Sequence, residues 1–203
     1  DKLIKIYNKK IISILDIGTG SGCIILSLLS NLKLSHGVGL DISKKAITIA
    51  KKNSEKCKLS NRVKFHTKSY EFLFNKKFDL IVSNPPYIEK KDIKNLSDDI
   101  KRYEPRMALD GGNDGLDLIK KVIYKSNEIL KINGMLALEI GNEQFKKVSK
   151  ILIDSNFRIK HVIKDYKNNV RCILSKYNKW LIIEEEILDL DHKKIILEEE
   201  VRL

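Results

Sequence analysis

The stretch Ile11-Ile12-Ser13-Ile14-Leu15-Asp16-Ile17-Gly18-Thr19-Gly20-Ser21-Gly22 decides the fold predicted for this chain of 203 residues. A short apolar run that stops at turn residues is typical of a buried strand. The glycines follow that strand at once, and a helical pattern runs from Cys23 to Leu32. Strand, glycine loop and helix in this order indicate a βαβ unit with a nucleotide-type site at the loop, although a tight turn is the plainer alternative.

The rest of the chain continues the alternation of strands and helices. Further strands are predicted at 36–40, 62–66, 78–83, 135–140, 157–163 and 170–174, and helices at 43–58, 116–131 and 144–155. Asn133-Gly134 is the predicted stop of the helix before it. The short turn Lys167-Asn168-Asn169 between the last two strands favours a hairpin. We therefore predict an α/β fold: a mostly parallel seven-stranded sheet with helices on both faces and a C-terminal antiparallel hairpin.

Ser83-Asn84-Pro85-Pro86-Tyr87 follows the buried strand at 78–83. Two prolines end the strand because they cannot donate to its ladder, and a residue before proline is pushed to extended dihedrals. Asn84 is thereby held at the carboxyl edge of the sheet. The asparagine amide, a proline carbonyl and the tyrosine ring together suit a flat group that bears an –NH2. An ordinary proline-rich loop is the alternative.

Two further residues follow strands in the same way. Asp41 ends the strand at 36–40, about 20 positions after the glycine loop, and suits a ribose diol. It would otherwise serve as a helix N-cap, a role that Ser43 can also fill. Tyr70 follows the strand at 62–66 and suits either a flat base or the core. Because parallel strands end at one edge, we expect the glycine loop, Asp41, Tyr70 and Asn84 to gather there.

Residues 88–114 are polar and irregular, and a long loop of this kind is often a binding loop. It contains Arg102-Tyr103-Glu104-Pro105-Arg106. A second glycine cluster, Gly111-Gly112-Asn113-Asp114-Gly115, follows no strand. We interpret this cluster as turn chemistry rather than a cofactor loop.

Charge and cysteines place limits on the class of protein. The formal net charge is +12, which predicts weak nonspecific attraction to polyanions, but only six of the 39 basic residues are arginine. Cys23, Cys57 and Cys172 form neither a metal pattern nor a disulfide framework, so no metal is expected. No signal peptide or membrane span is visible, and we expect a cytoplasmic protein.

The two ends of the chain differ from its middle. Residues 1–10 are predicted to be the end of a preceding helix or a linker. Residues 176–203 are an acidic tail or linker to which we assign no chemistry. The domain proper is predicted to span residues 11–175.

The motifs together resemble a known family. Asp16-Ile17-Gly18-Thr19-Gly20-Ser21-Gly22 with Asp41 resembles the cofactor site of class I S-adenosylmethionine-dependent methyltransferases, which have a Rossmann-like fold. Asn84-Pro85-Pro86-Tyr87 resembles their amino-methylating branch. The run Tyr103-Glu104-Pro105, the segment to Gly115, and Asp165-Tyr166 with Asn169-Val170-Arg171 are similar to the release-factor glutamine methyltransferases (the PrmC/HemK family).

The resemblance implies methyl transfer from S-adenosylmethionine to a glutamine side-chain amide in a peptide chain release factor, with S-adenosylhomocysteine as product. Asn84 and Pro85 would accept the two amide protons and Tyr87 would pack on the amide plane, so these three are the implied catalytic residues. The implied cofactor-binding residues are Asp16, Gly18, Thr19, Gly20, Ser21, Gly22, Asp41, Tyr70 and Asn84. The implied substrate-binding residues are Asn84, Pro85, Pro86, Tyr87 and Glu104.

Some features depart from the family and leave alternatives open. Ser69 stands where the family has an acidic residue before the aromatic. The family's N-terminal helical domain has no counterpart here, so a missing N-terminal domain, a further C-terminal domain or a small helper protein are open as partners. An adenine- or guanine-directed nucleic-acid methyltransferase, as part of a longer multidomain protein, is the alternative enzyme. A catalytically silent binding domain is the alternative outside enzymes.

Overall fold

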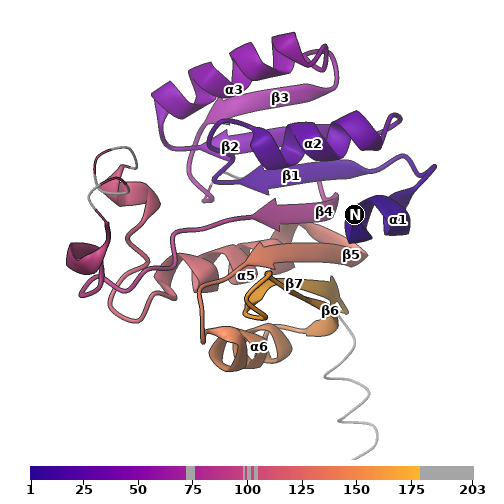
Figure 1. Ribbon diagram of the computed structural model, residues 1–203. Helices are drawn as coiled ribbons and strands as arrows, with labels where there is room; N and C mark the ends of the chain where they lie inside the picture. The colour runs from indigo at the N-terminus through magenta and orange to yellow at the C-terminus, as the bar shows by residue number, and fades with distance from the viewer. Residues whose placement is uncertain (72–75, 98, 100–101, 103–104, 179–203) are drawn as a thin grey trace, which may run out of the picture.

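The computed structural model describes residues 1–71, 76–97, 99, 102 and 105–178. Figure 1 shows a twisted sheet with helices on both faces. Tyr103, Glu104 and residues 179–203, which include most of the predicted acidic tail, lie outside the described residues.

In the described part of the chain, one sheet of seven strands has the order β3-β2-β1-β4-β5-β7-β6. Strands β1 to β5 run parallel, while β7 pairs antiparallel with both β5 and β6. The predicted mostly parallel sheet with a C-terminal antiparallel hairpin is confirmed. The strands are β1 Ser13–Ile17, β2 His36–Asp41, β3 Val63–Thr67, β4 Phe78–Ser83, β5 Leu130–Glu139, β6 Phe157–Lys164 and β7 Val170–Tyr177.

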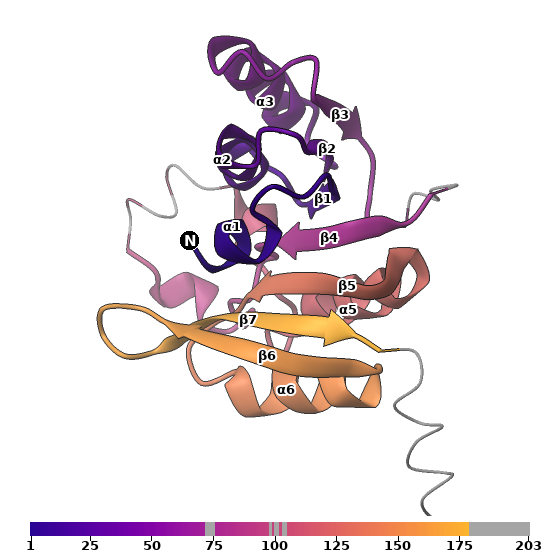
Figure 2. The same cartoon turned by 90° about the vertical axis from the view of Figure 1, so that its right-hand side faces the viewer.

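The helices cover the sheet in two layers, as Figures 1 and 2 show. On one face, residues of α1, α2 and α3 pack with Ile14, Leu80 and Ala137. On the other face, residues of α5 and α6 pack with Leu15 and Leu136. The helices are α1 Lys2–Tyr7, α2 Cys23–Asn31, α3 Lys44–Lys56, α5 Asp117–Ile129 and α6 Phe145–Asp154, with single 3-10 turns at Ile93–Asn95 and Arg106–Ala108.

The short helix α1 packs against the same face as α2. Its Tyr7 side chain is 8% exposed, and the Tyr7 hydroxyl donates to the Asp79 carbonyl at 3.1 Å. Burial, followed by the charge of Asp79, raises the pKa of Tyr7 to about 12. None of the helices in the described ranges is long and apolar enough to span a bilayer.

The predicted end of the helix at 116–131 is wrong. Helix α5 ends at Ile129, and Leu130 already pairs with Phe78 of β4. Asn133, with φ 66°, lies within a register shift of β5, so Asn133-Gly134 forms a bulge rather than a helix stop. Tertiary burial overrides the local signal here, because the Leu130 side chain is fully buried.

An ion pair holds this early start of β5 in place. The Lys131 Nζ atom donates to both Asp79 carboxylate oxygens, at 2.9 and 2.8 Å. The Ser13 N–H and hydroxyl also donate to Asp79 Oδ2. Burial alone would raise the pKa of Asp79, but the bonds from Lys131 and Ser13 outweigh it and the pKa is lowered. The contact ties β1, β4 and β5 together at the amino edge of the sheet.

The centre of the sheet supplies a test of the packing. We expect Leu136→Ala to lower the free energy of unfolding by about 2–5 kcal/mol, because its side chain is fully buried in β5 and a cavity would remain. Leu34→Ala is the matched control, since Leu34 is 60% exposed, and it should change stability by about 0.5 kcal/mol or less. Urea denaturation measures both, and equal losses would contradict the assignment of Leu136 to the core.

Candidate active site at the carboxyl edge of the sheet

The glycine loop leaves β1 and turns sharply into α2. Gly18, Gly20 and Gly22 have φ values of 73°, 55° and 82°, a region that side-chain-bearing residues seldom occupy. The N–H groups of Gly18 and Thr19 donate to the Leu40 carbonyl of β2 at 2.9 and 2.8 Å. A Cβ added to Gly18 or Gly20 would meet no atom within 4 Å. Open space therefore borders the backbone of the loop, as a closely approaching ligand requires.

The end of the loop at Gly22 is tightly packed, in contrast to the open space beside Gly18 and Gly20. A Cβ on Gly22 would come within 3.2 Å of Leu26 Cδ1, and Gly22 N–H donates to the Thr19 carbonyl at 2.9 Å. Ser21 is exposed, and its carbonyl accepts from Asn53 Nδ2 of α3 at 3.0 Å. These contacts hold the loop at the start of α2.

Asp41 connects the glycine loop to the start of α3. Its Oδ2 accepts from Gly20 N–H at 2.9 Å, and its Oδ1 accepts from Ser43 N–H at 2.8 Å. The Ser43 hydroxyl oxygen accepts from Ala46 N–H at 3.2 Å, so of the two residues considered for the cap, Ser43 is the one that caps α3. A carboxylate oxygen has two lone pairs, so Asp41 can still accept protons from a ligand at the loop.

Asp16 lies beneath the loop with 1% of its surface exposed. The Thr19 hydroxyl donates to its Oδ2 at 2.7 Å, whereas its Oδ1 has no hydrogen-bond partner. Burial raises the pKa of Asp16 to about 7. A buried acceptor without a donor is costly for a fold, and it indicates a place where a ligand donor is expected.

Tyr70 follows β3 at the same edge and is half-buried. It packs against the core on the α5 side of the sheet, and the Lys121 ammonium lies 5.7 Å from its ring centroid. Its hydroxyl donates to Glu71 Oε1 at 3.3 Å, and the Ser69 hydroxyl oxygen accepts from Glu71 N–H at 3.1 Å. One side of the ring is thus supported by the protein.

Strand β4 places Asn84 beside the glycine loop. Ile17, the residue before Gly18, pairs with Ser83, and the Ser83 hydroxyl donates to the Ile17 carbonyl at 2.7 Å. Ser83 and Pro85 are buried, Pro86 is half-buried, and Asn84 between Ser83 and Pro85 is exposed. The structure therefore brings exposed Asn84 to the edge of the sheet where the glycine loop also begins.

Tyr87 is half-buried. Burial, followed by the charge of the nearby Glu139 carboxylate, raises the pKa of Tyr87. Burial also raises the pKa of Glu139, although the Arg171 charge opposes this. Arg171 in turn pairs with Asp165 at 3.0 Å. The chain after Tyr87 pairs with the second glycine cluster, since Gly111 N–H donates to the Ile88 carbonyl at 2.9 Å.

The second glycine cluster has the turn chemistry predicted for it. Gly112 and Gly115 have φ values of 90° and 69°. Asp110 Oδ1 accepts from Gly112 N–H, and Asp114 Oδ1 accepts from Leu116 N–H, both at 3.0 Å. Sequence reasoning missed Glu139 and Gln144, which contact the Tyr87 segment. Glu139 is the last residue of β5 and Gln144 follows that strand, and polar residues at a strand's carboxyl end are the signal that singled out Asp41 and Asn84.

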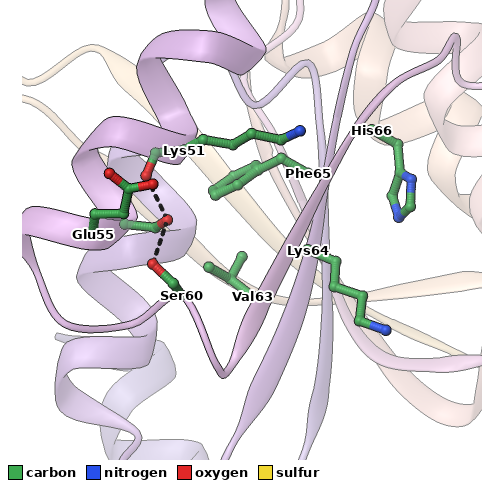
Figure 3. A pocket seen from close by; sticks show the side chains of 8 residues that line it. Lys51, Glu55, Ser60, Val63, Lys64, Phe65 and His66 are labelled. Atoms are coloured by element: carbon green, nitrogen blue, oxygen red, sulfur yellow. Dashed lines mark hydrogen bonds between the residues drawn. The ribbon is translucent and has the colours of Figure 1, made fainter.

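A separate hollow of about 340 Å³ lies between α3 and the edge strand β3 (Figure 3). Its walls mix lysines and His66 with Glu55 and the Phe65 ring, and Ser54 contacts Ser60 at 3.2 Å. None of the predicted site residues lines it. Across the described ranges, no three His, Cys, Asp or Glu side chains are arranged to hold a metal.

Comparisons with known proteins agree with this geometry. Residues 2–102 match the model of the methyltransferase small domain family. A release factor glutamine methyltransferase of Fusobacterium nucleatum is 46% identical over 169 residues, which are 81% of this chain and 47% of that protein. A bifunctional methyltransferase of Rickettsia conorii is 39% identical over 168 residues, 82% of this chain and 32% of that protein. The chain thus spans about half or less of the length of these relatives.

Solved structures show the same fold. A ribosomal protein L11 methylase from Lactobacillus delbrueckii subsp. bulgaricus has a TM-score of 0.62 at 20% identity, covering 86% of this chain and 75% of that one. A methyltransferase from Pyrococcus furiosus has a TM-score of 0.64 at 14% identity, and the match covers 87% of this chain and 80% of that one. The predicted Rossmann-like class I methyltransferase fold is confirmed.

The buried Asp16 predicts a pH dependence of stability. Its pKa of about 7 in the folded protein lies above the ordinary 3.8, so its contribution to stability is full below about pH 4 and is lost as the pH rises through about 7. Asp16→Asn should remove this contribution. We expect the unfolding free energy of the unsubstituted protein to fall, relative to the variant, by up to about 1.4 kcal/mol per pH unit between those limits.

Chemical denaturation at several pH values measures the difference between the two proteins. Asp154→Asn is the control, because Asp154 is exposed at the end of α6 and the variant should follow the unsubstituted protein at every pH. Parallel curves for the unsubstituted protein and Asp16→Asn would show that folding does not raise the pKa of Asp16.

Proposed function

Because the chain belongs to the family of the release factor glutamine methyltransferases, we propose that it methylates the side-chain amide nitrogen of a glutamine in a peptide chain release factor, with residues 11–175 as the methyltransferase domain. The observation that carries the proposal is the position of Asn84. Asn84 is exposed and directly follows Ser83, the last residue of β4, which pairs with Ile17 just before the glycine loop of β1.

The loop residues fit S-adenosylmethionine as the methyl donor. When bound, it supplies an electrophilic methyl group on a sulfonium centre. Gly18 and Gly20 leave open space at their backbone, Asp41 has lone pairs for ribose hydroxyls, and Asp16 Oδ1 lacks a donor. Thr19, Ser21, Gly22 and Tyr70 would complete the binding site that we propose for the cofactor.

Asn84 and Pro85 carry the proposed chemistry on the acceptor. An amide nitrogen is a weak nucleophile because its lone pair is delocalised into the carbonyl. The Asn84 side-chain oxygen and the Pro85 carbonyl would accept hydrogen bonds from the two N–H groups of the glutamine amide and so orient its nitrogen. As positive charge develops on that nitrogen, both acceptors bind it more strongly, and this differential lowers the barrier. The Tyr87 ring would pack on the amide plane and Pro86 would shape the loop. Glu104 stays a proposed substrate contact that lies outside the described residues.

A nucleic-acid methyltransferase is the second candidate, and one observation favours it. The +12 charge would attract a polyanion, and Asn84-Pro85-Pro86-Tyr87 also suits the exocyclic amine of a base. A methyl-transfer assay separates the two. The protein is incubated with methyl-labelled S-adenosylmethionine and a release factor, the same factor with its acceptor glutamine changed to glutamate, or RNA and DNA. Label that requires the glutamine supports the proposal, and label in nucleic acid alone, or none, contradicts it.

Asn84→Ala tests the role of the asparagine. We expect it to raise the transition-state barrier by about 2–4 kcal/mol, because a preorganised acceptor is lost, and so to lower kcat/KM by about 30- to 1,000-fold. Initial rates with a release factor measure this. The control is Asn31→Ala, an exposed residue at the end of α2, which should keep full activity. A rate for Asn84→Ala within a few-fold of the unsubstituted enzyme would remove Asn84 from the mechanism.

A further inference from the structure

We propose that Gln144 is a positioning residue that, with the glycines packed around Tyr87, fixes the Asn84–Tyr87 loop for catalysis. The inference rests on the proposed function and extends it to Gln144, whose hydrogen bonds go to Tyr87, Gly115 and Gly141 rather than to the glycine loop or Asp41. Gln144 immediately precedes α6 and is 9% exposed.

The Gln144 side chain joins three segments that are far apart in the sequence. Its Nε2 donates to the Tyr87 carbonyl at 3.0 Å and to the Gly115 carbonyl at 3.2 Å. Its Oε1 accepts from Gly141 N–H at 2.8 Å. The amide thus uses both its donor and its acceptor ends on backbone groups. A buried amide satisfied in this way is held in one orientation, and it holds its partners in turn.

Three glycines leave the space that this arrangement needs. A Cβ on Gly111 would lie 2.8 Å from Tyr87 Cα, and a Cβ on Gly141 would lie 2.9 Å from Tyr87 Cδ2. A Cβ on Gly115 would collide with the Tyr87 carbonyl oxygen and with Gln144 Nε2. Any side chain at these positions would push the loop outward. The second glycine cluster therefore serves the site by its close contact with Tyr87.

The ring end of Tyr87 lies against Gly141 and near the Glu139 carboxyl, whose charge acts on the Tyr87 hydroxyl. Tyr87 is consequently held at its carbonyl by Gln144, while Gly111 and Gly141 pack closely against its Cα and its ring. Asn84 and Pro85 precede it by only three and two residues, so displacing Tyr87 shifts the acceptors of the amide protons. Small misplacements of this kind reduce rates strongly, while binding of a ligand elsewhere is little affected.

Gln144→Glu is the sharpest test. The two side chains have nearly the same size, and the oxygen that accepts from Gly141 is kept, but a second oxygen replaces the donor opposite two carbonyls. We expect kcat to fall 10- to 100-fold, while KM for the release factor and the calorimetric Kd for S-adenosylmethionine stay within about two-fold. Hydrogen exchange of the amides at 87–90 should accelerate at least ten-fold. Asn142→Ala, an exposed neighbour, is the control and should match the unsubstituted protein in every measurement.

Gly111→Ala keeps the inference testable if Gln144→Glu does not fold. Gly111 lacks a positive φ, so the added methyl acts through its contact with Tyr87, and the same selective loss of kcat is expected. A kcat for both variants within two-fold of that of the unsubstituted protein would overturn the inference. A fall in kcat accompanied by equal losses of cofactor affinity and thermal stability would also overturn it, because the change would then be a general loss of structure. If the unsubstituted protein does not methylate glutamine, the proposed function fails, and unchanged exchange at 87–90 in the folded variants then refutes the positioning role by itself.

Discussion

The pairing of β1 with β4 is the contact on which the rest of the site depends. It puts Ile17 opposite Ser83, so the glycine loop and Asn84 leave neighbouring strands at the same level. The Ser83 hydroxyl bond to the Ile17 carbonyl reinforces that register. A slip of one residue would turn alternate side chains of β4 to the other face and move Asn84 away from the loop. Both strands are almost completely buried, which opposes such a slip.

Much of this arrangement could be predicted from the sequence, because parallel strands impose strong local patterns. The apolar runs of β1 and β4 end at glycine or proline, and each ending marks a strand's carboxyl end. Topology then brings those ends together without any knowledge of side-chain contacts. The sequence left open whether Asp41 or Ser43 caps the helix that follows, and the structure shows Ser43 as the cap.

Other features depend on contacts between distant segments, and local patterns cannot reveal them. Asn133-Gly134 has the residue types of a helix stop. The chain nevertheless joins the sheet earlier, because Leu130 pairs with Phe78 and Lys131 forms an ion pair with Asp79. Gln144 is a polar residue before a helix, and nothing nearby in the sequence shows that its amide reaches Tyr87 and Gly115. The turn residues of the second glycine cluster were predictable, but their packing against Tyr87 was not.

The contrast in burial between the end of β4 and the two residues after it has a consequence for recognition of the proposed acceptor. Ser83 and Pro85 are buried on either side of exposed Asn84, so the backbone there is already ordered before any acceptor arrives. Little backbone entropy remains for this segment to lose on binding, so most of the entropic cost of ordering falls on the bound partner. For the proposed reaction, a glutamine at the tip of a preformed turn should therefore be a better acceptor than the same residue in a disordered segment.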